Sequence, residues 1–144
     1  MIYFYRIAHF LYKLKIPLLP KIIYYLQFLL FNSSVPPSVE IGKGTKFAYG
    51  GIGVVIHARA KIGNHCIIGQ GITIGGKSKI YDVPVIGNKV FISSGVRILG
   101  DIKIGSNVII GANSVVVKNI ESNNMVAGVP AKVIRTNIMF DNYV

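Results

Sequence analysis

The chain has 144 residues, enough for one domain with a single hydrophobic core and too few for a second. Sixteen Lys and Arg residues against five acids give a formal net charge of +11, which favours an anionic partner. The basic residues are scattered and form no cluster with aromatic ones, so nucleic acid is not the expected partner. A phosphorylated coenzyme or an anionic membrane face fits this charge better.

The N-terminal segment, residues 1–34, is apolar and basic and contains no acid, since the first carboxylate is Glu40. Pro17 and Pro20 divide it into two short predicted helices. Neither apolar run reaches the roughly 20 residues of a membrane span, and no cleavage site of a signal peptide follows them. Two interpretations stay open. The segment packs on the rest of the chain or on a sister subunit, or it forms a basic amphipathic foot on a membrane surface.

After this segment a large apolar residue recurs every six positions, first at Val35, Ile41 and Phe47. The step restarts at Ile56 and continues through Ile62, Ile68, Ile74, Ile80, Ile86, Ile92, Ile98, Ile104, Ile110 and Val116. Gly or Ser often follows the apolar residue, as a tight corner requires. A period of six fits neither a helix nor a plain alternating strand. It fits a short strand and a corner, and three such hexads close a triangular coil.

Coils of eighteen residues stack with their strands about 4.8 Å apart and bury the periodic residues in one continuous core. Residues eighteen apart are then vertical neighbours. This frame predicts one column of His57, Gly75, Ser93 and Gly111, and another of Gln70, Asn88 and Ser106. Cys66 falls on an inward position, so a buried structural thiol is expected rather than a nucleophile. A single cysteine also excludes an internal disulfide and suits a reducing compartment, which points to the cytoplasm.

Two segments interrupt the period. Nine residues separate Phe47 from Ile56, so Ala48–Gly53 is predicted to bulge. The polar stretch Lys77–Tyr81 is predicted to protrude, although the step of six stays in phase across it. Interruptions of a solenoid are the usual places for binding surfaces.

The hexads, together with GVVIHARAKIG (53–63), IGQGITIGGKSK (68–79) and the closing AGVPAKVI (127–134), resemble the hexapeptide-repeat acyltransferases. More narrowly, the chain is similar to the serine acetyltransferase group and its smaller relatives in bacterial polysaccharide gene clusters. The resemblance covers residues 35–135, followed by a tail at 136–144. It implies an all-β fold, a left-handed parallel β-helix. It also implies a homotrimer that binds acetyl-CoA in the groove between neighbouring subunits. Apolar residues expected on the outer walls, Val54, Ile67 and Ile109, agree with a trimer.

One departure from this group concerns the acceptor. Serine acetyltransferases use two histidines, and the matching positions here hold Gly50 and Val83. The expected function is therefore acetylation of a sugar hydroxyl in bacterial surface polysaccharide biosynthesis. The alternatives are serine O-acetylation in cysteine biosynthesis and a non-catalytic, coenzyme-binding or structural trimer.

Acetyl transfer to a hydroxyl needs a base that takes its proton and a donor for the thioester oxyanion. The sequence offers three histidines, His9, His57 and His65. His57 is the predicted base, because its bulky titratable ring occupies a corner usually held by a small residue. Asp82 is the best acidic candidate for orienting it. Tyr49 is a candidate for positioning the acceptor, with aromatic packing as the alternative.

Gly75 and Gly76 have room for a peptide N–H to approach the thioester oxygen, although an ordinary corner explains them equally well. The resemblance implies a coenzyme site, with small residues along the pantetheine arm and lysines near the phosphates. These residues are Ser94, Gly95, Ala112, Lys118 and Lys132. A zinc enzyme on the same fold needs three converging histidines, and one of the three lies in the N-terminal segment. No metal is therefore expected.

Overall fold

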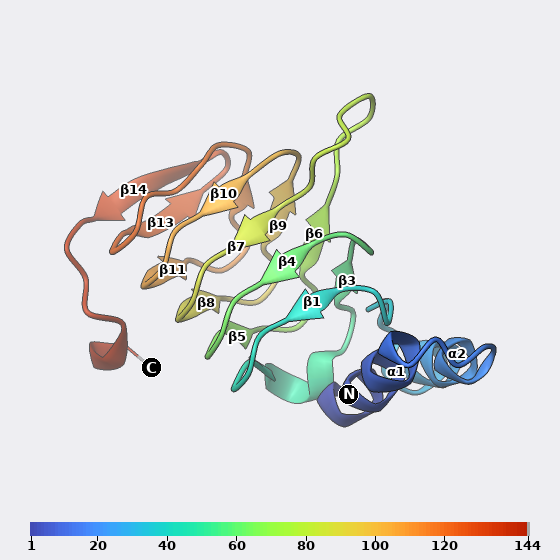
Figure 1. Cartoon of the computed structure of the whole chain (residues 1–144). Coiled ribbons are helices and arrows are strands. Elements are labelled where there is room, and N and C mark those ends of the chain that lie inside the picture. The colour runs from blue at the N-terminus through green and yellow to red at the C-terminus, as the bar shows by residue number, and fades with distance from the viewer. Residues whose placement is uncertain (144) are drawn as a thin grey trace.

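The structure is a computed structural model, and it describes residues 1–143. Two helices precede a stack of short strands, which Figure 1 shows as successive coils. The elements are α1 (Ile2–Lys13), α2 (Leu19–Phe31), β1 (Glu40–Ile41), β2 (Lys46–Phe47), η1 (Ala48–Gly51), β3 (Val55–Ile56), β4 (Lys61–Ile62), β5 (Ile67–Ile68), β6 (Thr73–Gly75), β7 (Val85–Ile86), β8 (Val90–Ile92), β9 (Arg97–Leu99), β10 (Lys103–Ile104), β11 (Val108–Ile110), β12 (Val115–Val116), β13 (Met125–Gly128), β14 (Ala131–Arg135) and η2 (Phe140–Asn142).

Consecutive strands belong to different sheets, so the chain passes three faces in turn. The first sheet has the order β1-β4-β7-β10, the second β2-β5-β8-β11-β13-β14, and the third β3-β6-β9-β12. Neighbouring strands are parallel except for the antiparallel hairpin β13–β14, which follows the last coil. The left-handed parallel β-helix of hexapeptide repeats, with a short helical N-terminal segment, is thereby confirmed.

The periodic residues form the core. In the third sheet Ile56, Ile74, Ile98 and Val116 stack in register, and none is more than 2% exposed. Cys66 is fully buried, as expected, and this burial raises the pKa of its thiol. Each coil therefore supplies one layer of a core that runs the length of the stack.

The predicted vertical neighbours are wrong only where they span the protruding loop. Beyond it, Ser93 and Gly111 are neighbours as expected, and so are Asn88 and Ser106. Ile74 pairs with Ile98, twenty-four residues on rather than eighteen, because the loop between β6 and β7 takes up one hexad. Ile80, which the step of six placed in the core, lies on that loop and is 43% exposed. The column of His57 therefore passes through Gly75 to Leu99 and not to Ser93.

The same shift affects the second column. Gln70 lies beside Ser94 instead of Asn88, with the Ser94 hydroxyl donating to Gln70 Oε1 at 2.5 Å. A loop of six residues keeps the period in phase, so the period cannot distinguish a hexad in the wall from one outside it. The other interruption is confirmed: η1 forms the bulge, with Tyr49 at φ 49° and Gly50 at φ 69°.

Two of the residues expected on the outer walls are buried within the chain. Val54 is fully buried in the core. Ile109 is 6% exposed because Ile138 and Phe140 of the C-terminal segment pack over it. Ile67 is half-buried. Of this trio only Ile67 therefore exposes apolar surface that a neighbouring subunit can cover.

The helices α1 and α2 pack together beside β1, at the open end of the stack (Figure 1). Tyr5 anchors them, since its hydroxyl donates to the Val39 carbonyl oxygen at 2.6 Å. Burial raises the pKa of Tyr5 to about 12, so this hydroxyl remains a donor even in alkaline solution.

The corrected register predicts unequal costs for the same substitution at two periodic positions. Ile98→Ala removes a fully buried side chain and is expected to cost about 2–5 kcal/mol of unfolding free energy. Ile80→Ala, on the exposed loop, is the matched control and is expected to cost less than about 0.5 kcal/mol. Urea unfolding at one fixed protein concentration measures both values. Equal losses would contradict the placement of Ile80 outside the core.

Candidate active site

The main chain around His57 is fixed by the coil stack. The residue follows β3, and its N–H donates to the Ile74 carbonyl oxygen of the next coil at 2.8 Å. Its own carbonyl oxygen accepts the Ala60 N–H at 2.9 Å, which closes the turn into β4. The position where the chain leaves the third sheet for the first, at His57 and Gly76, is called the His57 corner below.

The imidazole of His57 is half-buried and faces Gly76. A Cβ atom built on Gly76 would lie 3.8 Å from His57 Cδ2, 4.0 Å from His57 Nε2 and 3.4 Å from Val83 Cγ1. The other ring nitrogen, Nδ1, accepts the Arg59 N–H at 3.2 Å. In a neutral ring with this hydrogen bond the proton is on Nε2, the nitrogen that faces Gly76.

Two grooves flank the protruding loop beside this corner. One, of about 240 Å³, is lined by Arg59, Lys61, Tyr81, Asp82, Val83 and Val85. The other, of about 380 Å³, is lined by Gly76, Lys77, Ile80, Leu99, Gly100, Asp101, Ile102 and Val117. Figure 1 shows the loop standing clear of the coils between β6 and β7. Val83 connects the first groove to the His57 ring, because it lines that groove and also contacts the space at Gly76.

Arg59 ties the tip of the loop to the coil beneath it. Its guanidinium carbon lies 3.9 Å from the centre of the Tyr81 ring, and its Nη2 donates to the Tyr81 carbonyl oxygen at 2.5 Å. Asp82 lines the same groove and is exposed. In the described residues 1–143 no hydrogen bond joins Asp82 to His57, whose Nδ1 partner is the Arg59 main chain. The groove is therefore lined by both a guanidinium and a carboxylate.

Several predicted residues lie on a different corner, where the chain passes from the second sheet to the third. Tyr49 sits in the bulge there and is 75% exposed. Ser94 and Gly95 lie on the same corner, and the Gly95 N–H donates to the Gln70 carbonyl oxygen at 2.9 Å. Ala112 occupies the next coil and is exposed. This position is called the Ser94 corner.

The two predicted lysines are both exposed. Lys118 follows β12 at the His57 corner, and Lys132 lies on β14, where it pairs with Ala127. The expected site residues thus fall into two groups. The third sheet separates them, and a strand of three residues spans about 10 Å.

The other two histidines are placed elsewhere. His9 Nδ1 lies 2.7 Å from the Pro37 carbonyl oxygen, between α1 and the first coil. His65 has φ 54° and lines a groove with Asn88 and Ser106, where the chain passes from the first sheet to the second. The sequence reasoning missed Arg59 and Tyr81. The feature of the sequence that could have indicated Arg59 is its position two residues after His57.

Comparison with known proteins identifies the repeats and the fold. The family model described as "Bacterial transferase hexapeptide (six repeats)" matches residues 84–118. A serine acetyltransferase of Bacillus pumilus is 36% identical over 138 residues, which cover 94% of this chain and 63% of the relative.

Two solved structures show the same fold. The serine acetyltransferase of Neisseria gonorrhoeae in complex with serine has a TM-score of 0.86 at 35% identity, covering 93% of this chain and 55% of that one. The Brucella abortus serine acetyltransferase in complex with coenzyme A has a TM-score of 0.85 at 34% identity, covering 95% and 55%. The chain spans less than two thirds of the length of each of these proteins.

These relatives overturn the expected acceptor. The prediction of a sugar hydroxyl in polysaccharide biosynthesis is wrong, because the similar proteins are serine acetyltransferases. The two positions without family histidines, Gly50 and Val83, do not outweigh similarity along almost the entire chain. The coarser prediction is confirmed: this chain is a left-handed β-helix of hexapeptide repeats, of the type found in acyltransferases.

Proposed function

We propose that this chain transfers the acetyl group of acetyl-CoA to the hydroxyl of L-serine, with His57 as the general base. The observation that carries the proposal is the position of the His57 ring, which faces Gly76 beside a groove. That groove is lined by a cation, Arg59, and an anion, Asp82, which together match the two charges of an amino acid. The relatives that support it are serine acetyltransferases, one solved with serine and one with coenzyme A.

The groove formed by Arg59 and Asp82 accounts for the acceptor. A serine zwitterion carries a carboxylate, which a guanidinium binds well, and an ammonium, which a carboxylate binds. In this groove Arg59 takes the first group and Asp82 the second. The hydroxymethyl group then points past Val83 towards the His57 ring. This assignment gives Asp82 an acceptor-binding role in place of the orienting role expected from the sequence.

His57 removes the hydroxyl proton as the oxygen attacks the thioester carbonyl carbon. In the observed geometry Nε2 carries the proton of a neutral ring. To accept the serine proton at Nε2, the imidazole first moves its own proton to Nδ1, at the expense of the 3.2 Å bond from the Arg59 N–H. That bond is long and is lost at little cost.

Acetyl-CoA supplies the acetyl group and leaves as the free thiol. Gly75 and Gly76 lack side chains, so a peptide N–H at this corner can approach the thioester oxygen as negative charge develops on it. The small residues of the Ser94 corner leave room for the pantetheine arm. Lys118 and Lys132 are exposed cations for the coenzyme phosphates.

A homotrimer brings these two groups together. In one chain the Ser94 corner lies where the strands of the third sheet begin, and the His57 corner lies where they end. A neighbouring subunit that places its Ser94 corner against the His57 corner completes the site without any change within either chain.

A second candidate is a trimer that binds coenzyme A without catalysing transfer. The observation in its favour is the pair of positions, Gly50 and Val83, where the serine acetyltransferase group carries histidines. Such a trimer would retain the residues that contact the coenzyme, but no residue in it would act as the general base.

Thiol release from acetyl-CoA tests the proposed reaction. L-serine is expected to stimulate release, with O-acetylserine identified by mass. Ethanolamine lacks the carboxylate and 3-hydroxypropionate lacks the ammonium, so each leaves one charge of the groove without a partner and is expected to be a poor acceptor. Coenzyme binding without serine-stimulated release would favour the non-catalytic trimer.

Substitution of His57 tests the base. His57→Ala and His57→Gln are both expected to lower kcat by about 10²–10⁴-fold and to leave acetyl-CoA affinity unchanged. Gln retains an amide donor but cannot accept a proton. His65→Gln, on another corner, is the control and is expected to stay active. If His57→Gln alone keeps activity, the ring acts as a hydrogen-bond donor and the base assignment fails.

Mixed oligomers test the composite site. Native mass measurement at micromolar concentration is expected to give three chains. His57→Ala and Ala112→Trp each disable a different corner and are expected to be inactive alone. When the two are co-expressed, each mixed trimer has one site of its three with two intact corners, about a quarter of all sites after equal random mixing, so activity should reappear. A stable monomer, or no complementation between two folded variants, would rule out a shared site.

A further inference from the structure

Polar and apolar side chains of α2 are arranged inside out. Apart from Lys21 and two tyrosines, Gln27 is the only polar residue of this helix. It is 1% exposed, and its Nε2 donates to the Val35 carbonyl oxygen at 3.3 Å. Leu29, on the opposite side, is 79% exposed. In a helix of an ordinary soluble domain this order is reversed.

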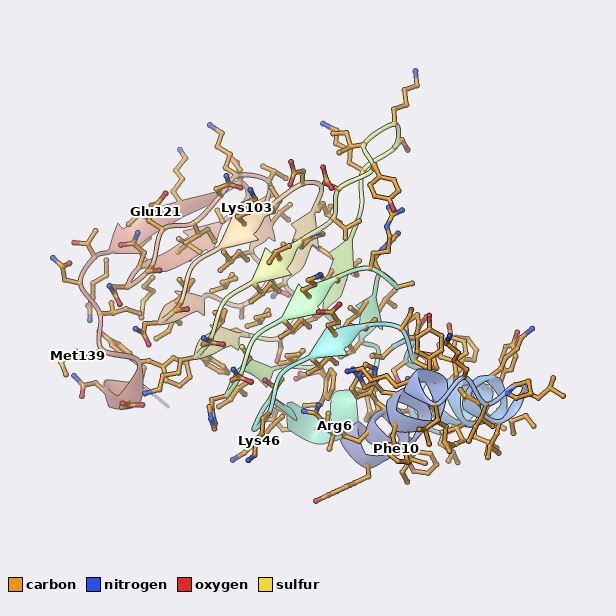
Figure 2. All side chains as sticks on the ribbon, in the orientation of Figure 1. Arg6, Phe10, Lys46, Lys103, Glu121 and Met139 are labelled. Carbon is orange, nitrogen blue, oxygen red and sulfur yellow. The ribbon has the colours of Figure 1, made fainter. Side chains whose placement is uncertain are left out.

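The polarity of α1 is reversed in the same way. Arg6 donates from Nη1 and Nη2 to the carbonyl oxygens of Ile41 and Gly42, each at 2.6 Å. Tyr5 and His9 also bond to main-chain carbonyls of the first coil. The helix therefore directs three of its polar side chains, Tyr5, Arg6 and His9, at the solenoid. Figure 2 shows Arg6 and Phe10 on this helix, and Phe10 is 61% exposed.

The outer surface of the helix pair is apolar. Phe10, Leu14, Ile22, Leu26, Phe28 and Leu29 are each between 44% and 79% exposed. Soluble proteins rarely leave so many large apolar side chains together in water, and such patches mark surfaces that are covered in use. This outer face of α1 and α2 is called the helix-pair face.

The charge around the helix-pair face is of one sign. Lys13, Lys15 and Lys21 are exposed around the turn that joins the helices, and no carboxylate occurs before Glu40. Lys21 also lines an apolar groove of about 400 Å³ with Tyr12, Ile16, Tyr25 and Pro36. A second copy of the chain docked here would set the lysines of one copy against those of the other, since the acid beside them, Glu40, shares a groove with Lys13 on the side of the first coil.

From this we infer that the helix-pair face docks on the surface of an anionic lipid bilayer. The apolar side chains enter the boundary between headgroups and acyl chains, and the three lysines meet lipid phosphates. The tyrosines, which have an apolar body and a polar tip, suit the headgroup level. No helix in residues 1–143 is long and apolar enough to cross a membrane. The pair therefore lies on the bilayer rather than across it.

The test is sedimentation of the full chain with vesicles of phosphatidylcholine, with or without phosphatidylglycerol. Binding is expected to need the anionic lipid and to weaken with salt. The triple variant Lys13→Gln, Lys15→Gln and Lys21→Gln should bind about a hundredfold more weakly, from about fivefold per lysine. The triple variant Lys77→Gln, Lys79→Gln and Lys103→Gln makes the same change in net charge away from the helices and should bind almost as well as the parent chain. Equal losses in the two would mean attraction by net charge alone and overturn the inference.

A label on the apolar side gives a second measurement. Cys66 is fully buried, so Leu29→Cys adds a single accessible thiol for an environment-sensitive fluorophore. Its emission is expected to shift to the blue on anionic vesicles and to stay unchanged with coenzyme A. An unshifted label on bound protein overturns the inference. The double variant Phe28→Ser and Leu29→Ser gives a further check. If it breaks up a larger oligomer but still binds vesicles, the helix-pair face is a protein interface and the inference is overturned.

Discussion

The structure depends on the parallel pairing of each coil with the next. Strands of two to five residues cannot hold together alone, and here each is hydrogen-bonded to the strand of at least one neighbouring layer, and the inner strands of each sheet to two. The same stacking places Ile74 over Ile56 and buries both, so the ladder and the core form together. Every corner is then fixed by two neighbouring coils. This rigidity holds His57 in place: its N–H is bonded to Ile74 of the next coil and its carbonyl oxygen to Ala60.

A stack of this kind can accept insertions at its corners without loss of the core. The segment between β6 and β7, residues 76–84, contains one inserted hexad, and the strands on either side of it still pair in register with β3 and β4. The chemistry of the candidate site gathers around this loop. Its tip is held down by Arg59 on Tyr81, and its far end brings Val83 to Gly76 and His57. The loop thus forms the walls of two grooves without contributing a strand.

A stack also has two ends, where the edges of its sheets require partners. At the C-terminal end the antiparallel β14 pairs with β13, and Ile138 and Phe140 cover Ile109. At the N-terminal end the carbonyl groups of the first coil accept hydrogen bonds from Tyr5, Arg6, His9 and Gln27. Meeting this requirement directs Tyr5, Arg6, His9 and Gln27 inward, while the lysines of the helices stay exposed. The apolar residues that remain point outward, which is why capping the solenoid and exposing an apolar, basic face go together.

The sequence alone determined the class of fold, because a period of six has one simple physical solution, a coil of three short strands. It also predicted the bulge at Ala48–Gly53, the buried thiol of Cys66 and the two N-terminal helices. Each of these rests on local spacing or on composition. The acceptor assigned from two missing histidines was wrong, because two positions weigh less than similarity along the whole chain.

Only the tertiary structure decided which residues meet. Because the hexad inserted in the loop left the period unbroken, the sequence placed Ile80 in the core. For the same reason, the predicted neighbours across the loop are wrong by six residues. The pairing of Arg59 with Tyr81 joins residues 22 apart and follows from no repeat. The separation of the His57 and Ser94 corners by the third sheet depends on how far the chain turns at each corner. A one-dimensional pattern records the spacing of residues along the chain but not which coil lies above which, and that stacking sets the geometry of the site.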